Sequence, residues 1–277
     1  MREISLEELL EAGCHFGHQV TRQNPKARDF IFEARDNIHI IDLEKTKEGL
    51  ETAARHLKEL AQTGKTVIVV GTKRQAQNII AEKIKQVKEE APGNIYYVTT
   101  RWIGGILTNF AEVKKNSKKL TDIVALLKDE SMRAKYTKKE LGLIDKERQK
   151  LEQFYGGVLD MDKIPDALFI IDTHLEDLAV REAKRMGVET IGIVDTNADP
   201  YVIDYPIPAN DDAVGSVKLI VDYMLDAWSE GKKQQATSDK KQEKKEEKKE
   251  EPVAVEGQAA EKVVEEKPKK RGRKKKK

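Results

Sequence analysis

The chain has 277 residues, of which 38% are hydrophobic, 36% are charged and only 5% are aromatic. This composition leaves enough material for a buried core and favours a solvated helical surface over a large aromatic ligand pocket. A single cysteine excludes an internal disulfide framework, and no apolar run is long enough to span a membrane or form a signal peptide, so we expect a soluble cytoplasmic protein.

The net charge of +2 conceals two parts of opposite charge. Residues 231–277 contain 18 Lys or Arg and 10 Asp or Glu, a charge of +8; the totals of 51 and 49 therefore leave 33 basic and 39 acidic residues, a charge of −6, in residues 1–230. Because the folded part lacks a general positive field, any contact with nucleic acid must come from local groups of cations.

The first segment combines a helix signal with a group of potential metal ligands. Ser5 and Glu8 have the spacing of a capping box, which predicts a short helix rather than a signal peptide. Cys14, His15 and His18 follow, and the two histidines have a spacing that suits one side of a turn. A metal site also needs carboxylates from elsewhere, for which the chain offers Asp195, Asp199, Asp211 and Asp212. We expect no metal and no cofactor; the candidate ligands are His15, His18 and Asp195.

Short apolar runs rich in Ile and Val recur along the chain, separated by segments with helical periodicity. The runs span residues 38–41, 67–70, 95–98, 167–171 and 191–194. Each is too short for a buried helix and is typical of a strand covered on both faces. Strand and helix in alternation predict an α/β fold in which a parallel sheet carries helices on both faces.

The segment GTKRQ at residues 71–75 follows a predicted strand and opens a predicted helix. Backbone N–H groups at such a helix start favour phosphate, and Lys73 and Arg74 add positive charge, which makes an RNA phosphate one candidate ligand. The alternative is a charged helix start that faces solvent. The GKT at residues 64–66 is not a P-loop, because it precedes the strand and lacks the earlier glycine.

Residues 99–110 read TTRWIGGILTNF and link the third run to a long charged segment. Two adjacent glycines permit backbone geometry that other residues rarely adopt. Arg101 and Trp102 offer a guanidinium and a large π-face, which suit nucleic acid, and Asn109 adds a polar side chain. The alternative for the tryptophan is local packing.

The connection from residue 99 to residue 166 is too long for a simple crossover. Apolar residues recur at three- and four-residue spacing on both sides of a break at 129–136, and Thr137 with Glu140 forms a capping box where the returning helix begins. The pattern predicts a projecting antiparallel helical hairpin, inserted at about residues 106–158 and paired along a coiled-coil interface. One side of its first helix carries Lys114, Lys115, Lys118 and Lys119, hereafter the hairpin lysines, which either contact RNA phosphates or form a solvated face.

Asp172 and Asp195 each follow a predicted strand directly, at the edge where α/β enzymes place catalytic groups. Such carboxylates can hold Mg²⁺ or transfer protons. However, the chain lacks a GxGxxG loop, a complete P-loop and an evident nucleophile with its base. We therefore prefer the structural interpretation, in which these carboxylates cap the turns that follow them.

Apolar periodicity continues from Val214 to Trp228 and then stops, leaving mostly Lys, Glu, Gln and Ala. We predict a folded body over residues 1–230 and a disordered Lys/Glu-rich tail over residues 231–277, because the tail has little apolar surface to bury. Its terminal run, KPKKRGRKKKK, either contacts RNA weakly or is only solvated.

Four segments together resemble one family. They are AGCHFGHQVTRQNPK at 12–26, TTRWIGGILTNF at 99–110, GIVDTNADP at 192–200 and PANDDAVGSVKL at 208–219, in the order found in the bacterial ribosomal protein S2 family of the small subunit. The resemblance extends from about Ser5 to Trp228. It implies a flavodoxin-like, three-layer fold and a structural role in the ribosome without enzymatic activity.

The resemblance also implies partners. These are small-subunit ribosomal RNA and neighbouring ribosomal proteins, including ribosomal protein S1, which the chain would help to dock for translation; no membrane or DNA is implied, and the location is the cytoplasmic ribosome. The expected RNA contacts are Arg22 and Lys26 from the first matching segment, with Lys73, Arg74, Arg101, Trp102, Asn109 and the hairpin lysines. The alternative is a flavodoxin-like enzyme or regulatory domain that uses the strand-end carboxylates.

Overall fold

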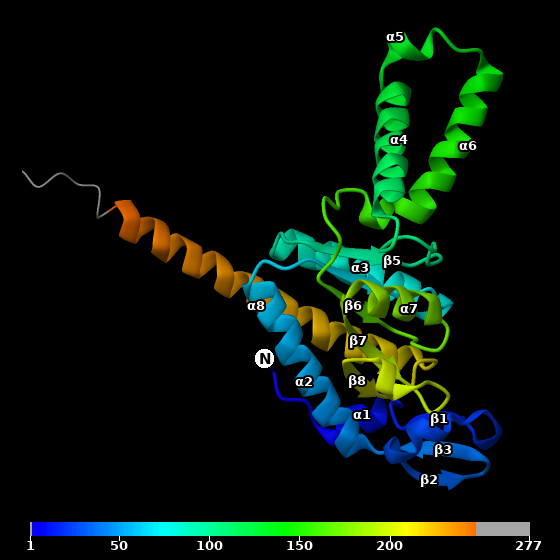
Figure 1. The fold of residues 1–277 in the computed structure, drawn as a ribbon, viewed down its shortest axis with the longest axis vertical. Helices are drawn as coiled ribbons and strands as arrows, with labels where there is room; N and C mark the ends of the chain where they lie inside the picture. Colours follow the sequence, from blue (N-terminus) through cyan, green and yellow to red (C-terminus); the bar gives the residue numbers. More distant parts are fainter. Residues whose placement is uncertain (1, 248–277) are drawn as a thin grey trace, which may run out of the picture. The chain divides into compact units, whose positions relative to one another are not determined.

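The computed structural model describes residues 2–247, and its central element is a five-stranded parallel sheet (Figure 1). The strands have the spatial order β5-β4-β6-β7-β8. Counted along the chain, this is the second, first, third, fourth and fifth strand, which is the flavodoxin-like arrangement. The predicted fold class is therefore confirmed. The strands are β4 (Val67–Val70), β5 (Ile95–Val98), β6 (Ala167–Ile170), β7 (Glu189–Val194) and β8 (Tyr205–Pro208).

Helices cover both faces of this sheet. Successive residues of each strand point to opposite faces, so each strand contributes side chains to two cores. Val67 and Val69 face a core formed with three helices, which are α2 (Leu43–Gln62), α3 (Arg74–Glu90) and the first part of α8 (Val214–Glu247). Ile68 and Val70 face a second core, formed with α7 (Asp177–Met186) and the base of the helical hairpin. Burial on both faces explains why these strands read as continuous apolar runs.

A second, antiparallel sheet lies near the N-terminus and has the order β1-β3-β2. The prediction that residues 38–41 join the parallel sheet is therefore wrong. Asp36 and Asn37 have φ angles of 51° and 62°, and two successive residues with positive φ make a tight turn that folds one strand back on the other. The fifth strand of the parallel sheet is β8 instead. Its two prolines are unusual in a strand, so the sequence pattern does not predict it. The antiparallel strands are β1 (Phe16–Gln19), β2 (Ile31–Arg35) and β3 (Ile38–Ile41).

Short helices frame the antiparallel sheet. Helix α1 (Leu6–Glu11) begins after Ser5, whose hydroxyl oxygen accepts a hydrogen bond from the Glu8 N–H at 3.1 Å. Only this half of the predicted capping box forms, because the Glu8 carboxylate pairs with Arg2 at 3.2 Å. Three 3-10 helices lie in the connecting segments: η1 (Val20–Arg22), η2 (Pro25–Phe30) and η4 (Pro200–Val202).

The predicted helical hairpin is present and extends away from the sheet at the β5 edge (Figure 1). It consists of α4 (Phe110–Lys128), α5 (Glu130–Arg133) and α6 (Lys138–Tyr155), and a 3-10 turn, η3 (Gly156–Val158), follows. Thr137 and Glu140 form the reciprocal capping box that the sequence predicts. Val113, Leu120 and Ile123 are buried in α4, whereas residues 129–140 are all exposed. The outer end of the hairpin is therefore available for contacts.

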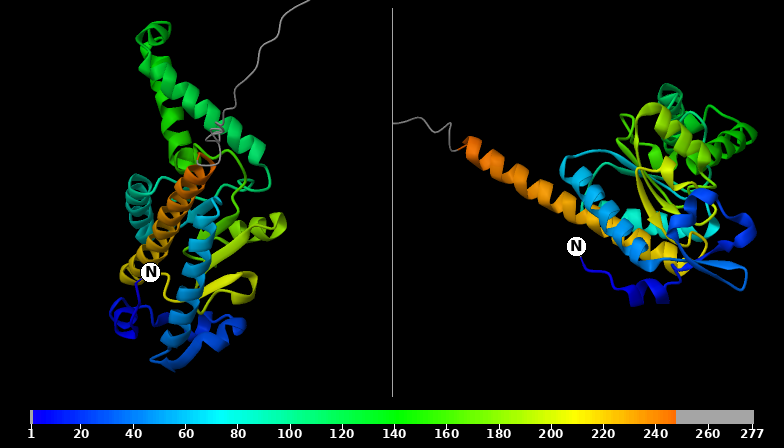
Figure 2. Two further views of the ribbon diagram at one scale, coloured as in Figure 1. Left: turned by 90° about the vertical axis from the view of Figure 1, so that its left-hand side faces the viewer. Right: turned by 60° about the horizontal axis from the view of Figure 1, so that its bottom comes forward.

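Helix α8 continues beyond the point where the sequence predicts the body to end. Residues 231–247 remain helical, which differs from the disordered tail predicted for this stretch. Lys, Glu, Gln and Ala are strong helix formers, and Gly231 brings α8 close to α2: a Cβ atom there would lie 2.5 Å from the carbonyl oxygen of Lys58. Figure 2 shows α2 beside the earlier part of α8. The rest of the predicted tail, residues 248–277, lies outside the described residues. Within residues 2–247, no helix is long and apolar enough to cross a membrane.

Candidate nucleic-acid interface

The loop between β5 and α4 presents one cation and buries its tryptophan. Arg101 is exposed, whereas Trp102 is only 4% exposed and packs with Ile106 and Leu107 in the core on the α7 side of the sheet. Gly105 has a φ of +101°, a conformation that glycine adopts without strain. The loop therefore offers a guanidinium to a partner, and Trp102 holds the loop to the body.

A buried carboxylate fixes the shape of this loop. Glu182 of α7 is 6% exposed and accepts hydrogen bonds from the backbone N–H groups of Gly105 at 2.7 Å, Leu107 at 3.2 Å and Thr108 at 3.3 Å. The hydroxyl of Thr108 donates to the same carboxylate at 3.3 Å. Sequence reasoning missed Glu182, although its position between Ala179 and Ala183 on the apolar side of a predicted helix marks an acid that needs buried partners.

The hairpin lysines are all exposed on α4, away from its buried residues. Lys115 pairs with Glu112 at 3.0 Å, Lys119 pairs with Glu147 of α6, and Lys114 lies 4.0 Å from Asp162. Lys118 makes no ion pair with any residue that the structure describes. Exposed pairs of this kind contribute about 1 kcal/mol or less, so they leave the ammonium groups available to a phosphate. Asn109 is also exposed and its side chain does not cap α4.

Lys73 has a different environment from the other predicted contacts. Its ammonium lies 2.8 Å from Asp172, 2.8 Å from Asp211 and 2.7 Å from Asp212. Burial by itself lowers the pKa of Lys73, but the three carboxylates outweigh burial and raise it. The ammonium is thus already neutralised within the fold, whereas the neighbouring Arg74 is exposed at the start of α3.

The strand-end carboxylates hold backbone and side-chain donors. Asp172 accepts hydrogen bonds from the N–H groups of His174 at 2.9 Å and Leu175 at 2.8 Å, and Asp195 accepts one from Thr196 N–H at 2.5 Å. The predicted capping role is confirmed at Asp172, whereas Asp195 accepts only from the residue directly after it. These contacts are local in sequence, because each carboxylate binds the one to three residues that follow it.

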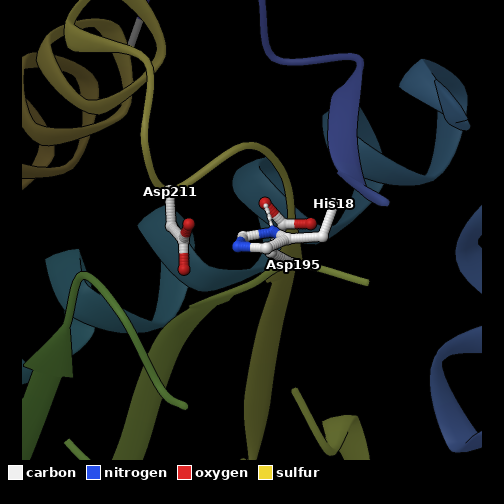
Figure 3. Close-up of side chains that lie close together, drawn as sticks. All are labelled: His18, Asp195 and Asp211. Atoms are coloured by element: carbon white, nitrogen blue, oxygen red, sulfur yellow. Dashed lines mark ion pairs between the residues drawn. The ribbon is translucent and has the colours of Figure 1, made fainter. Parts of the chain in front are cut away.

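Two of the three candidate metal ligands lie together, and a third ligand joins them. His18 Nδ1 is 3.1 Å from Asp195 Oδ2, and the ligand atoms of His18, Asp195 and Asp211 all lie within 4.8 Å of one another. Figure 3 shows the imidazole between the two carboxylates. His15 is not part of this group; its ring packs on Phe16 with centroids 4.0 Å apart.

Charge and burial shift the pKa values of this group. Contact with the Asp195 carboxylate raises the pKa of His18, while partial burial acts in the opposite direction. Burial, with the nearby charges of Asp172 and Asp195, raises the pKa of Asp211 to about 7. Both shifts favour the protonated form of the side chain, so they reduce the negative charge of the group.

The two remaining predicted contacts come from the segment after β1. Arg22 is exposed in η1, and Lys26 is exposed at the start of η2, where its ammonium pairs with Asp199 at 2.5 Å. Asp199 also caps η4 by accepting from the N–H of Tyr201 at 3.1 Å. The expected RNA contacts therefore fall into separate groups rather than one patch, with Arg22 and Lys26 beside β1 and the hairpin lysines on α4.

The chain matches the family model described as ribosomal protein S2 over residues 9–231. It is 46% identical over 233 residues to the small ribosomal subunit protein uS2 of Coprothermobacter proteolyticus, which covers 84% of each chain. It is also 46% identical to the protein of the same name from Geotalea uraniireducens, where the match covers 83% of this chain and 88% of the relative. The protein of that name from Solibacter usitatus is 46% identical as well, and the match covers 84% of this chain and 75% of the relative.

Proposed function

The chain belongs to the ribosomal protein S2 family, and we propose that it binds small-subunit ribosomal RNA through exposed cations and helps to dock ribosomal protein S1. Family membership makes it a small-subunit ribosomal protein and removes the alternative of an enzyme that uses the strand-end carboxylates. The ribosome is accordingly its place of action.

One observation carries the proposal for RNA: the hairpin lysines and Arg101 are exposed beside a loop whose backbone Glu182 holds in place. The body has a charge of −6 over residues 1–230, so attraction at a distance cannot direct a polyanion to it. Cations at contact distance must supply the affinity. We propose Arg22, Arg74, Arg101, Asn109 and the hairpin lysines as contacts, with Lys26 available when its pair with Asp199 opens.

Lys73 and Trp102 have a supporting role in this proposal. The ammonium of Lys73 is shared by three carboxylates, and Trp102 is buried in the core. The sequence predicts that both residues touch RNA; we propose instead that Lys73 holds strand ends together and that Trp102 anchors the β5–α4 loop in the core. Their replacement would act on RNA binding through the shape of the loops.

Replacement of the four hairpin lysines by Gln tests the RNA proposal. Gln and Lys have similar helix propensity, so the hairpin should remain folded. If each lysine neutralises one phosphate, the slope of log affinity against log salt should fall by up to about 3.6, which is four contacts at about 0.9 each. The matched control replaces four exposed lysines of α6, Lys138, Lys139, Lys146 and Lys150, by Gln.

Salt-dependent binding to small-subunit ribosomal RNA and occupancy in purified subunits are the two measurements. We expect the α4 variant to lose affinity and salt dependence while the α6 variant stays near the parent. Equal losses in both variants would mean that only net charge matters. Unchanged binding by a folded α4 variant would place the RNA elsewhere on the protein.

The antiparallel sheet supports the docking of a protein partner. Phe32 is 72% exposed, Phe16 is 48% exposed, and a groove of about 330 Å³ lies between Leu10, Phe32 and Leu43. Exposed apolar side chains around a groove favour protein contacts over RNA contacts. A Phe32→Asp variant should capture less ribosomal protein S1 in a binding assay, whereas Leu143→Asp, at a 60% exposed position on α6, should not. The reverse result would move the docking surface to the hairpin.

A further inference from the structure

We propose that His18, Asp195 and Asp211 bind one divalent transition-metal ion. Their ligand atoms lie within 4.8 Å of one another, although the residues come from three separate parts of the chain (Figure 3). His18 belongs to β1, Asp195 follows β7 and Asp211 follows β8. The antiparallel sheet and the carboxyl edge of the parallel sheet thus meet at this point.

One oxygen of Asp195 lies beside His18 but accepts no hydrogen bond within residues 2–247. The Asp195 side chain is 1% exposed, and its Oδ1 atom accepts hydrogen bonds from the N–H of Thr196 at 2.5 Å and its hydroxyl at 3.1 Å. The Oδ2 atom accepts no hydrogen bond from any described residue, although it lies beside His18. A buried carboxylate oxygen without a hydrogen-bond donor is costly, so this oxygen favours a cation in contact with it, either the protonated imidazole of His18 or a metal ion.

The spacing of His18 and Asp195 suits the coordination of one ion. Metal–nitrogen and metal–oxygen bonds of about 2.1 Å, at angles between octahedral and tetrahedral, place two ligand atoms about 3.0 to 3.4 Å apart. The distance from His18 Nδ1 to Asp195 Oδ2 is 3.1 Å, without the direction of a hydrogen bond. One imidazole and two carboxylates favour Zn²⁺ or a neighbouring transition metal over Mg²⁺, which prefers oxygen ligands alone.

Neighbouring residues hold the three ligands in position. Thr196 orients Asp195 through the two hydrogen bonds above, and its Oγ1 atom also accepts from the N–H of His18 at 3.0 Å. Lys73 donates to Oδ1 of Asp211 at 2.8 Å. Metal sites commonly have such outer contacts, whose loss weakens binding. The site would join β1 to the ends of β7 and β8 and so stabilise the antiparallel sheet.

The test measures Zn²⁺ binding to the full chain after removal of metals by a chelator. Equilibrium dialysis at pH 7.5, with elemental analysis, should find about one tightly bound Zn²⁺ in the parent, and thermal unfolding should shift upward with Zn²⁺. His18→Gln and Asp195→Asn should each weaken binding at least tenfold and remove that shift. His15→Gln is the matched control, because it removes a neighbouring histidine that lies outside the group; it should bind as the parent does.

Imidazole nitrogen NMR of the parent keeps the test decisive if the His18 variant does not fold. Added Zn²⁺ should move a ring nitrogen of His18 and leave those of His15 and His174 in place. The proposal would be overturned if a folded His18→Gln variant still bound Zn²⁺ as the parent does. It would also be overturned if Zn²⁺ shifted the ring-nitrogen signals of other histidines instead, or if the parent bound no Zn²⁺ tightly.

Discussion

Replacement of Glu182 by Ala should weaken the fold and loosen the loop that carries Arg101. The change leaves three backbone N–H groups, those of Gly105, Leu107 and Thr108, without their acceptor. A buried unpaired N–H costs about 1–3 kcal/mol, and the loop can relax toward water in part, so we expect a loss of about 3–5 kcal/mol in the free energy of unfolding. For a chain of this size, that corresponds to a fall of roughly 6–20 °C in Tm.

Urea unfolding and hydrogen exchange measure the two consequences separately. The free energy of unfolding should fall without a change in the denaturant slope, and the amides of Gly105, Leu107 and Thr108 should lose protection. Affinity for ribosomal RNA should fall at temperatures where the variant is still folded. The control is Asp177→Asn on the same helix, whose exposed pair with Arg181 should contribute less than about 0.5 kcal/mol.

The reasoning about the loop would be refuted by a Glu182→Ala variant that loses less than about 1 kcal/mol and keeps these amides protected. Such a result would mean that Trp102 and the apolar contacts hold the loop without the carboxylate. A variant that loses stability but keeps full RNA affinity would separate the loop from binding, which would leave the hairpin lysines as the main contact.

Three further predictions concern the fold. Cys14 is fully buried, and burial raises the pKa of its thiol. A thiol reagent should therefore label the native chain at under about 1% of the rate for the unfolded chain. Rapid labelling would show that the N-terminal segment opens. Gly231→Ala should lower the free energy of unfolding, measured in urea, by about 1–3 kcal/mol, because its Cβ would lie 2.5 Å from the Lys58 carbonyl oxygen. Gly142→Ala, whose Cβ would have nothing within 4 Å, should be neutral or stabilising. Equal effects would contradict tight packing of α2 on α8. Asn37→Gly should preserve stability, while Asn37→Val should lose about 1–3 kcal/mol at a φ of 62°; tolerance of valine would mean that the turn changes shape.

Regular periodicity predicted most of the fold. Buried runs such as Val67–Val70 are apolar on both faces, and the capping box at Thr137 marks where α6 begins. The failures have local causes. Residues 38–41 look like any other short Ile-rich strand, and only the two positive φ angles at Asp36 and Asn37 direct them into a second sheet. The proline-containing β8 lacks a strand pattern, although it closes the edge of the parallel sheet.

The candidate site was less predictable because its contacts join distant residues. The sequence shows Lys73 at a helix start, but not that three carboxylates from two other strand ends surround its ammonium. Likewise, Trp102 and Arg101 are adjacent in the chain, yet one is buried and the other exposed. The position of a helix residue such as Glu182 on an apolar face can be read from periodicity, whereas its backbone partners in another loop cannot.

Hydroxyl-radical probing from single cysteines tests the central claim, that the α4 side of the hairpin faces RNA, most directly. The buried Cys14 leaves an introduced cysteine as the reactive thiol, so an iron chelate can be attached at Lys118→Cys on α4 or at Glu59→Cys on α2. Helix α2 packs near β8, at the opposite end of the sheet from β5 and the hairpin. In assembled small subunits, we expect strong, localised cleavage of ribosomal RNA from position 118 and much weaker cleavage from position 59. Cleavage from position 59 with none from position 118 would contradict the account.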